Sequence, residues 1–345
     1  MHLAVRGGKG RHAEVVKKVR WGILGTGAIA RQFVRGLRSL PDAEVFAVGS
    51  RSEASASKFA DKRNIPRRHA SYHGLASDPD VDVVYIATPH PFHAENATLC
   101  LEAGKPVLCE KPFSVNATEA ERVIGLAREK DLFLMEGMWT RFFPLMEEVR
   151  RLISTGVLGE VRMLNVDFGF RAEADPASRL FAPWLGGGAL LDVGVYCVSF
   201  ASMVLGPPSG SVGIPHLGDT GVDEQASIIL EHERGRLANL SVGIRTTTPQ
   251  EATIMGTEGY VRIHHPWWRP HSMTISRPGE EDETIEAPVT GNGFNYEATE
   301  VMRCLEAGET ESNIMPLDET ISILRTMDGI REAWGLRYPG EEAAT

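Results

Sequence analysis

The stretch VRWGILGTGAIARQFVRGL, residues 19–37, joins a short apolar run to a helical pattern through a glycine-rich turn. Gly25 permits a tight turn, Gly27 leaves room for a phosphate to approach the backbone, and the small Ala30 allows the helix to pack closely on the strand. Free N–H groups at the start of such a helix face the phosphates. The turn predicts a dinucleotide-binding site, and the alternative is an ordinary bend between strand and helix. The residues expected to bind the cofactor here are Gly25, Thr26, Gly27, Ala28 and Ile29.

The pattern around this turn repeats along the first third of the chain. Short apolar runs alternate with amphipathic helical stretches, which predicts an α/β fold with a parallel, doubly wound Rossmann sheet. The expected strands are 19–24, 45–50, 83–88, 107–110 and 132–135, and the expected helices are 31–40, 53–63, 92–103 and 117–130.

The end of the second expected strand, VFAVGSRSE at 45–53, indicates which dinucleotide binds. An NAD site places Asp or Glu there to hold the ribose 2′-hydroxyl, whereas this chain has Ser50 and Arg51, and Glu53 comes too late. Because a guanidinium pairs with a 2′-phosphate and a carboxylate repels it, these residues favour NADP(H) over NAD(H). The alternative is that Arg51 is only a solvated side chain at the start of the next helix.

After about residue 140 the pattern changes to alternating strands separated by turns such as HERGR and GTEG. The expected strands are 161–171, 225–232, 236–244, 251–255, 260–264, 273–277 and 284–287, followed by helices at 294–307 and 317–334. This part is expected to form an α+β domain with an open, mostly antiparallel sheet. We therefore expect a basic, disordered extension or an upstream start over 1–18, the dinucleotide-binding domain over 19–140, a second domain with C-terminal helices over 141–335, and a tail over 336–345.

Length and composition limit the possible functions. A chain of 345 residues exceeds the usual size of a single core, so two domains are expected. A formal charge of −10 argues against nucleic acid or an anionic membrane as the main partner. No apolar run is expected to reach the roughly 18 to 20 residues needed to span a bilayer. The cysteines form no CxxC pair, so we expect buried free thiols and a cytoplasmic enzyme.

Two stretches carry side chains suited to chemistry. In GKPVLCEKPF, 104–113, Lys111 follows a buried strand, at the edge where open α/β sheets bind ligands, and its ammonium could stabilise a substrate oxygen. In GGGALLDVGVYCVSFASMVLG, 186–206, Asp192 is the one charged residue of an apolar helix, and Tyr196 lies one turn further on the same face. The alternative makes Asp192 a helix cap or satisfied core acid and Tyr196 simple core packing.

Aromatic and arginine side chains further along the chain could line a substrate pocket, although ordinary packing would explain each of them equally well. The candidates are Trp139, Arg141, Phe142, Phe168, Phe170 and Arg171. The pairs His90–His93 and His264–His265 have no third ligand at suitable spacing, so no metal site is expected.

Four motifs in this order and spacing, GTGAIA at 25–30, ATPHPFHAE at 87–95, EKP at 110–112 and GGGALLDVGVY at 186–196, resemble the glucose–fructose oxidoreductase, inositol dehydrogenase and MocA (Gfo/Idh/MocA) family. The resemblance implies a second domain whose broad sheet mediates homo-oligomerisation, most simply as a dimer. It implies that Lys111 contacts both nicotinamide and substrate, and that Thr88, Pro89, His93 and Glu110 lie near the cofactor. Tyr196 and MEGMWTRFFP at 135–144 look closer to the dimeric dihydrodiol dehydrogenase and sugar dehydrogenase branch than to the inositol dehydrogenases.

Together these observations predict an NADP(H)-dependent oxidoreductase acting on a secondary alcohol or carbonyl of a sugar, polyol or cyclic diol. Tyr196 would act as general base or acid, Lys111 would lower its pKa, and Asp192 would orient the substrate or the lysine. Two alternatives remain: a regulatory protein that only senses NADP(H), and a glycosidase or lyase with tightly bound NAD that is recycled in each turnover.

Overall fold

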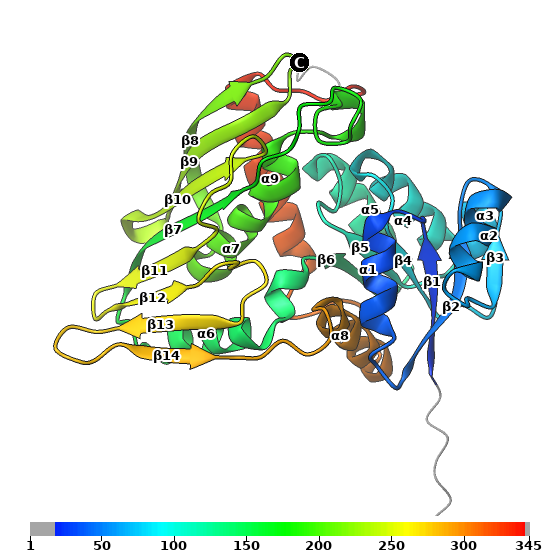
Figure 1. The fold of residues 1–345 in the computed structure, drawn as a ribbon, viewed down its shortest axis with the longest axis horizontal. Helices are drawn as coiled ribbons and strands as arrows, with labels where there is room; N and C mark the ends of the chain where they lie inside the picture. The colour runs from blue at the N-terminus through cyan, green and yellow to red at the C-terminus, as the bar shows by residue number, and fades with distance from the viewer. Residues whose placement is uncertain (1–17, 342–345) are drawn as a thin grey trace, which may run out of the picture.

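A computed structural model provides the structure of the protein and describes residues 18–341. All but the last residue of the predicted extension over 1–18 therefore lie outside the described residues. The chain forms two β-sheets at opposite sides of the molecule, with helices between them (Figure 1). The predicted fold class, a Rossmann sheet followed by a mostly antiparallel sheet, is confirmed.

The first sheet, sheet A, contains six parallel strands in the order β3-β2-β1-β4-β5-β6. Its strands are β1 (Val19–Leu24), β2 (Ala43–Gly49), β3 (Arg67–His69), β4 (Val83–Ile86), β5 (Val107–Glu110) and β6 (Leu134–Gly137). The helices that connect them are α1 (Ala28–Leu37), α2 (Glu53–Asp61), α3 (Tyr72–Ala76), α4 (His93–Glu102) and α5 (Ala117–Glu129). Strand order reverses between β1 and β4, and this reversal opens a crevice at the carboxyl ends of the strands.

The second sheet, sheet B, contains eight strands in the order β14-β13-β12-β11-β7-β10-β9-β8, and among its pairs only β7 and β10 run parallel. Its strands are β7 (Val161–Gly169), β8 (Pro208–Leu217), β9 (Asp223–His232), β10 (Arg236–Gly243), β11 (Ala252–Gly256), β12 (Tyr260–Ile263), β13 (Ser272–Ser276) and β14 (Glu283–Glu286). The sequence did not predict β8, because its prolines and glycines are typical of loops. Proline is tolerated in β8 because the strand lies at the sheet edge.

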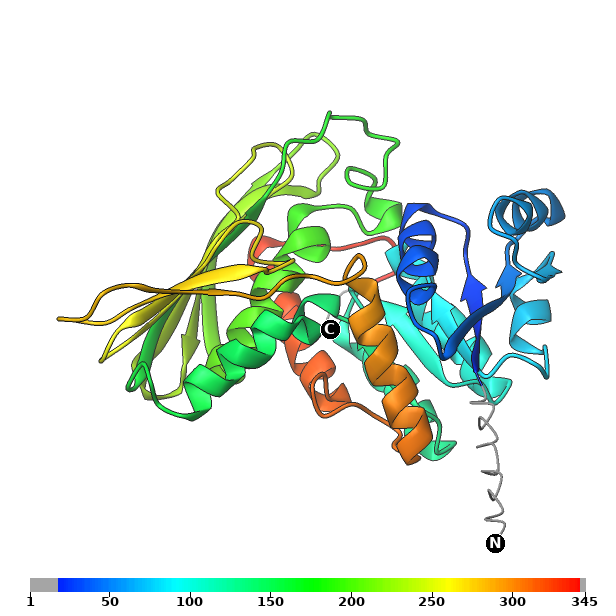
Figure 2. The same ribbon diagram turned by 60° about the horizontal axis from the view of Figure 1, so that its bottom comes forward.

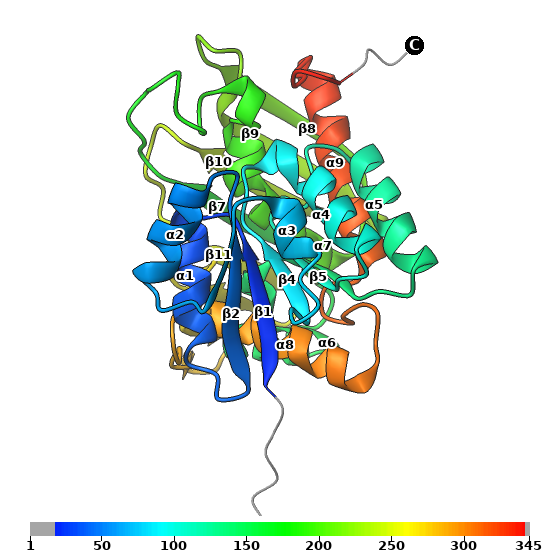
Figure 3. The same cartoon turned by 90° about the vertical axis from the view of Figure 1, so that its right-hand side faces the viewer.

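Four helices pack between the two sheets, as Figures 2 and 3 show from two further directions. They are α6 (Pro144–Ser154), α7 (Val195–Leu205), α8 (Phe294–Ala307) and α9 (Leu317–Trp334). Helix α9 contacts α5 and β6 on one side and α7 and β8 on the other. One hydrophobic core contains residues of both sheets, so the two halves form a continuous packed unit. Five short helices complete the fold: η1 (His90–Phe92), η2 (Trp139–Phe142), η3 (Pro183–Leu185), the π-helical turn η4 (Leu190–Gly194) and η5 (Glu233–Gly235).

The helical segment Pro183–Leu205 corrects one expectation from the sequence. It is 23 residues long and contains an 18-residue window with a mean hydropathy of 1.8, so by length and composition it could cross a membrane. In the structure, 94% of its apolar window is buried inside the protein, as in a core helix.

The segment that follows α9 folds back onto the loop before η4. The hydroxyl of Tyr338 donates to the carbonyl oxygen of Gly187 at 2.6 Å, and Glu341 pairs with Arg331 at 2.8 Å. The first contact holds residues 336–341 to the loop of residues 186–188, and the second holds them to α9.

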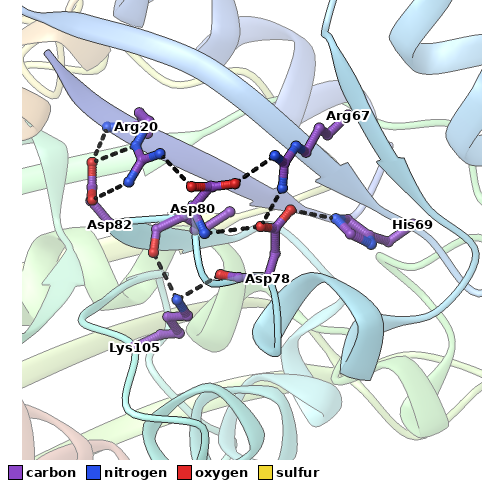
Figure 4. Close-up of polar contacts among 8 residues, drawn as sticks. Arg20, Arg67, His69, Asp78, Asp80, Asp82 and Lys105 are labelled. Carbon is purple, nitrogen blue, oxygen red and sulfur yellow. Dashed lines mark hydrogen bonds and ion pairs between the residues drawn. The ribbon is translucent and has the colours of Figure 1, made fainter.

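A network of ion pairs crosses the edge of sheet A opposite the crevice (Figure 4). The buried carboxylate of Asp78 accepts hydrogen bonds from Arg67 at 2.8 Å and from the backbone N–H of Asp80 at 3.0 Å, and its other oxygen lies 2.9 Å from His69 Nε2. Lys105 donates to the carbonyl oxygen of Asp78 at 2.7 Å. Asp78 thus links β3 to the loops that precede β4 and β5.

Candidate active site

The glycine-rich turn connects β1 to α1 at the carboxyl end of sheet A. Gly25 has a φ of +108°, and a Cβ there would lie 2.8 Å from the carbonyl oxygen of Ala87. A Cβ at Gly27 would meet no atom closer than 4.0 Å, so this side of the turn faces open space. Gly27 is the N-cap of α1, and no side chain caps the helix. The N–H groups of the first helical turn are therefore available to a pyrophosphate.

The turn borders a cleft of about 730 Å³, a volume typical of ligand-binding sites. Every residue predicted to bind the cofactor lines this cleft: Gly25, Thr26, Gly27, Ala28, Ile29, Ser50, Arg51, Thr88, Pro89, His93, Glu110 and Lys111. The remaining lining residues are Ser52, Ser55, Tyr72, Ala87, His90, Arg179, Leu185 and the predicted catalytic Asp192. The cleft thus brings the crevice of sheet A together with the loop that precedes α7.

Lys111 follows β5, and its ammonium reaches the start of the second domain's long apolar helix. Its Nζ donates to the carbonyl oxygen of Asp192 at 2.6 Å and lies 3.6 Å from Asp192 Oδ1. The same Nζ lies 4.6 Å from the ring centroid of Tyr196. The side chain is 13% exposed, and burial lowers the pKa of Lys111 although Asp192 opposes this change. A lysine with a lowered pKa exchanges protons more readily near neutral pH.

Asp192 lies in the π-helical turn η4, which directly precedes α7. Its Oδ1 accepts a hydrogen bond from Arg179 Nη1 at 2.8 Å, and its other oxygen lies 3.5 Å from Arg179 Nη2. Burial opposes ionisation of Asp192, but Lys111 and Arg179 outweigh burial and hold its pKa well below the usual range. Asp192 therefore stays charged and fixes both cations.

Arg179 is a site residue that the sequence did not reveal. It lies thirteen residues before Asp192, in the irregular loop after β7, and its side chain is half exposed at the cleft. Neither helical spacing nor a motif marked it, because the ion pair forms only after the loop folds across the start of α7.

Tyr196 lies in the first turn of α7 and is buried except for 8% of its surface. Its hydroxyl oxygen accepts a hydrogen bond from Trp139 Nε1 at 3.0 Å, so this bond does not use the phenol's own proton. Burial, with the nearby charges of Glu110 and Asp192, raises the pKa of Tyr196 well above its ordinary value. The expectation that Lys111 lowers this pKa is wrong, because the ammonium lies over the ring face while carboxylates and burial dominate.

A group of buried acids lies behind Lys111. Glu110 accepts hydrogen bonds from the hydroxyl of Tyr85 and, at 3.2 Å, from the backbone N–H of Lys111. Glu297 on α8 is fully buried, and both of its carboxylate oxygens lack a hydrogen-bond partner. Burial and the neighbouring Glu110 raise the pKa of Glu297 well above its ordinary value. Sequence inspection missed Glu297, since it reads as one of several glutamates on an amphipathic helix.

Of the predicted substrate residues, only Asp192 lines the cleft, and Tyr196 lies beside Lys111 without lining it. Arg141 is 3% exposed, pairs with Glu319 at 2.6 Å, and donates to Ser199 at 3.0 Å, so its guanidinium is used in holding η2 to α7 and α9. Trp139 stacks on Phe294 with ring centroids 4.5 Å apart. Phe168 stacks on Trp268 at 5.2 Å, and Phe170 packs against the core. Two of these side chains contact Tyr196 directly: Trp139 through its indole N–H and Phe168 through its ring.

Two histidines, His90 and His93, line the wall of the cleft. The two ring nitrogens of His93 each lie 2.8 Å from a backbone carbonyl oxygen, those of Thr88 and Pro112. Burial lowers the pKa of both His90 and His93. Within residues 18–341, no group of three or more His, Cys, Asp or Glu side chains is placed to hold a metal ion.

Comparisons with known proteins agree with this geometry. The family model described as "Oxidoreductase family, NAD-binding Rossmann fold" (GFO_IDH_MocA) matches residues 19–138, and that of the GFO/IDH/MocA C-terminal domain matches 146–262. The chain is 40% identical over 332 residues to trans-1,2-dihydrobenzene-1,2-diol dehydrogenase of Xenopus tropicalis, covering 93% of this chain and 99% of that protein. The human protein of the same name is 38% identical over 336 residues, covering 94% and 99%.

Two solved structures share the complete architecture. A 3-ketoreductase from Actinomadura kijaniata, in complex with NADP and TDP-benzene, superposes with a TM-score of 0.83 at 27% identity, covering 92% of this chain and 98% of that one. An aldose-aldose oxidoreductase from Caulobacter crescentus, complexed with glycerol, gives a TM-score of 0.83 at 25% identity, covering 92% and 98%.

Proposed function

Because the chain belongs to the Gfo/Idh/MocA family of oxidoreductases, we propose that it transfers a hydride between NADP(H) and a secondary alcohol or carbonyl group of a sugar, polyol or cyclic diol. The observation that carries this proposal is the placement of Lys111 in the cleft that the glycine-rich turn borders, with its Nζ held by Asp192. Relatives named for dihydrodiol oxidation and ketone reduction support a carbon-bound hydroxyl or carbonyl as the reacting group.

The residues of the cleft fit a nicotinamide dinucleotide. The open space at Gly27 and the uncapped start of α1 would hold the pyrophosphate. Ser50 and Arg51 follow β2 and would receive the 2′-phosphate, while Glu53 does not line the cleft. The neighbouring 3-ketoreductase structure holds NADP, which supports the choice of NADP(H). The nicotinamide, when bound, supplies or accepts the hydride.

Lys111 and Tyr196 form the acid/base pair of the proposal. The ammonium of Lys111 donates a hydrogen bond to the substrate oxygen and stabilises negative charge that develops there during reduction. Tyr196 keeps its proton because its pKa is raised, and it donates that proton to the same oxygen. In the oxidation direction the same step runs in reverse: Tyr196, deprotonated, takes the proton of the substrate hydroxyl, and the ammonium of Lys111 stabilises the charge on that oxygen as the hydride leaves. Asp192 and Arg179 fix the position of Lys111.

The experiment that tests this function combines cofactor binding with turnover. Purified protein is titrated with NADPH and NADH by tryptophan fluorescence, and then screened with NADP⁺ against trans-dihydrodiols, aldoses and polyols. We expect tighter binding of NADPH and turnover of at least one of these classes. Lys111→Met is expected to lower kcat by at least about 10²-fold while NADPH still binds. Binding of neither nucleotide would exclude the dehydrogenase function.

The open face of sheet B supports a further proposal, that the protein is a homodimer through this face. Cross-strand neighbours on β7, β8, β9 and β10 expose large apolar side chains there: Met163 (40%), Val212 (66%), Ile214 (80%), Ile229 (42%) and Leu237 (37%). Such a stripe on a monomer is typical of an interface. We expect a dimer by light scattering and a monomer for Val212→Asp with Ile229→Asp. A wild-type monomer would contradict the proposal.

A further inference from the structure

A second cavity, of about 420 Å³, lies between α1 and α2 beside the cofactor cleft. It is lined by Thr26, Arg31, Ser55, Lys58, Phe59, Lys62 and Arg63, and we call it the basic groove. Four of these side chains are cationic and none is acidic, in a protein whose formal charge is −10. The groove is therefore a local concentration of positive charge on an acidic molecule.

The cations of the basic groove lack carboxylate partners. Within residues 18–341, none of Arg31, Lys58, Lys62 and Arg63 forms an ion pair. Arg63 instead lies over the ring of Phe59, 4.2 Å from its centroid. Burial lowers the pKa of Arg63, and the charges of Arg31 and Arg38 lower it further. No ion pair within the described residues offsets the repulsion that Arg63 meets, and a bound anion would reduce it.

The groove and the cofactor cleft meet at shared residues. Thr26, in the glycine-rich turn, and Ser55, in the first turn of α2, line both cavities. Ser55 Oγ accepts a hydrogen bond from Ser52 Oγ at 2.9 Å, so the hydroxyls lie together at this rim. Lys58 follows Ser55 by three residues and lies on the same face of α2. A phosphate at the shared rim would meet hydroxyl donors and, on the groove side, Lys58 and Arg31.

Arg51 lines the cofactor cleft but not the basic groove, so it does not occupy the space beside Arg31 and Lys58. Its guanidinium carbon lies 6.0 Å from the ring centroid of Phe92, and its charge also acts on Tyr72. Arg51 thus approaches the rim from the α3 and α4 side of the cleft, whereas Arg31 and Lys58 approach it from α1 and α2. Arg51 therefore lines the cofactor cleft, and Arg31 and Lys58 line the basic groove that shares its rim.

We propose that the basic groove binds a phosphate group, and that in the holoenzyme this group is the 2′-phosphate of NADP(H), held by Lys58 and Arg31 in addition to Arg51. This inference rests on the proposed NADP(H) function and adds two residues that determine cofactor specificity. It implies that loss of Arg51 alone leaves part of the preference for NADPH over NADH.

The test measures dissociation constants of NADPH and NADH for wild type, Arg31→Gln, Lys58→Gln and Arg51→Gln by fluorescence titration. Arg31→Gln and Lys58→Gln are each expected to weaken NADPH binding about tenfold and NADH binding less than about twofold. Inorganic phosphate is added as a second probe, and it is expected to compete with NADPH but not with NADH. Free phosphate that binds without displacing NADPH would overturn the assignment to the 2′-phosphate.

Arg35→Gln is the matched control, since it removes the same charge from α1 one turn beyond Arg31 and lines neither cavity. Arg35→Gln should change neither dissociation constant by more than about twofold. The inference is overturned if Arg31→Gln and Lys58→Gln behave like Arg35→Gln, or if they weaken NADPH and NADH equally. Failure of the proposed function is distinguishable, because the wild-type protein would then bind neither nucleotide, or would bind NADH as tightly as NADPH.

Discussion

Lys111 and Asp192 are 81 residues apart in the chain and meet across the cleft, where Lys111 Nζ donates to the Asp192 carbonyl oxygen at 2.6 Å. The lysine follows a strand of sheet A, whereas the aspartate begins the core helix of the second domain. Because the ammonium is bound to both the backbone and the carboxylate of Asp192, its position depends on how the two halves of the molecule pack. A change at Asp192 should therefore alter proton exchange by Lys111.

Replacement of Asp192 by asparagine is expected to lower kcat by about 10²-fold and to shift the pH dependence of turnover. Asp192 raises the pKa of Lys111 against the effect of burial, so its loss lowers that pKa further. The limb of the kcat/KM profile that belongs to Lys111 should move to lower pH. Asp192→Glu, which keeps the charge, serves as control, and an unmoved limb in Asp192→Asn would exclude the coupling.

Tyr196→Phe is expected to reduce kcat for carbonyl reduction by about 10²-fold, because it removes the proton donor but keeps the ring beside Lys111. The NADPH dissociation constant should change little, since the hydroxyl bonds to Trp139 and does not line the cleft. Steady-state kinetics and fluorescence titration separate the two effects. Unchanged turnover would remove Tyr196 from the acid/base pair.

Glu297→Gln is expected to stabilise the protein at neutral and alkaline pH. The pKa of Glu297 is raised in the folded state, so the wild-type protein loses stability as pH rises above the unfolded value of about 4.3. Glutamine stays neutral and avoids this loss, so the variant gains stability relative to the wild type as pH rises. Melting curves at pH 5, 6.5 and 8 should show a gap in Tm that widens with pH. A constant gap would mean that Glu297 does not titrate in this range.

Asp78→Asn tests the ion-pair network of Figure 4. Burial opposes ionisation of Asp78, but the backbone N–H of Asp80, His69 and Arg67 outweigh burial and lower its pKa. The charged form therefore contributes stability above the unfolded pKa of about 3.9, and this contribution is lost as pH falls through the folded value. Asparagine is expected to cost about 2 kcal/mol at pH 7. Urea unfolding at pH 7 and near pH 3 should show a difference that shrinks in acid, and equal differences would argue against an electrostatic origin.

The dinucleotide half of the site could be predicted because its signals are local. A strand, a turn with Gly25 and Gly27, and a following helix are adjacent in sequence, and the strand ends at Ser50 and Glu110 converge wherever a parallel sheet forms. Strand β8 could not be predicted, since its edge position, not its composition, makes proline acceptable.

The substrate half depends on contacts that sequence spacing does not encode. Arg141 read as a pocket residue, yet its guanidinium pairs with Glu319, which lies 178 residues further along the chain. Arg179 lines the cleft, although no motif or helical spacing in the sequence marks it as a site residue. The raised pKa of Tyr196 follows from burial and from Glu110, both of which arise only when sheet A packs against α7.

The π-helical turn η4 has a consequence for how this site can change by insertion or deletion. A π turn holds one residue more than the α-helical turn that would replace it, and each residue of an α-helix turns the chain by about 100°. Deleting Val193 or Gly194, which lie between Asp192 and α7, would leave the buried face of α7 in place and rotate Asp192 away from Lys111. The direction of the Asp192 carboxylate therefore depends on the extra residue of η4, whereas the packing of α7 in the core does not. A single-codon deletion could thus remove the chemistry and leave the fold intact.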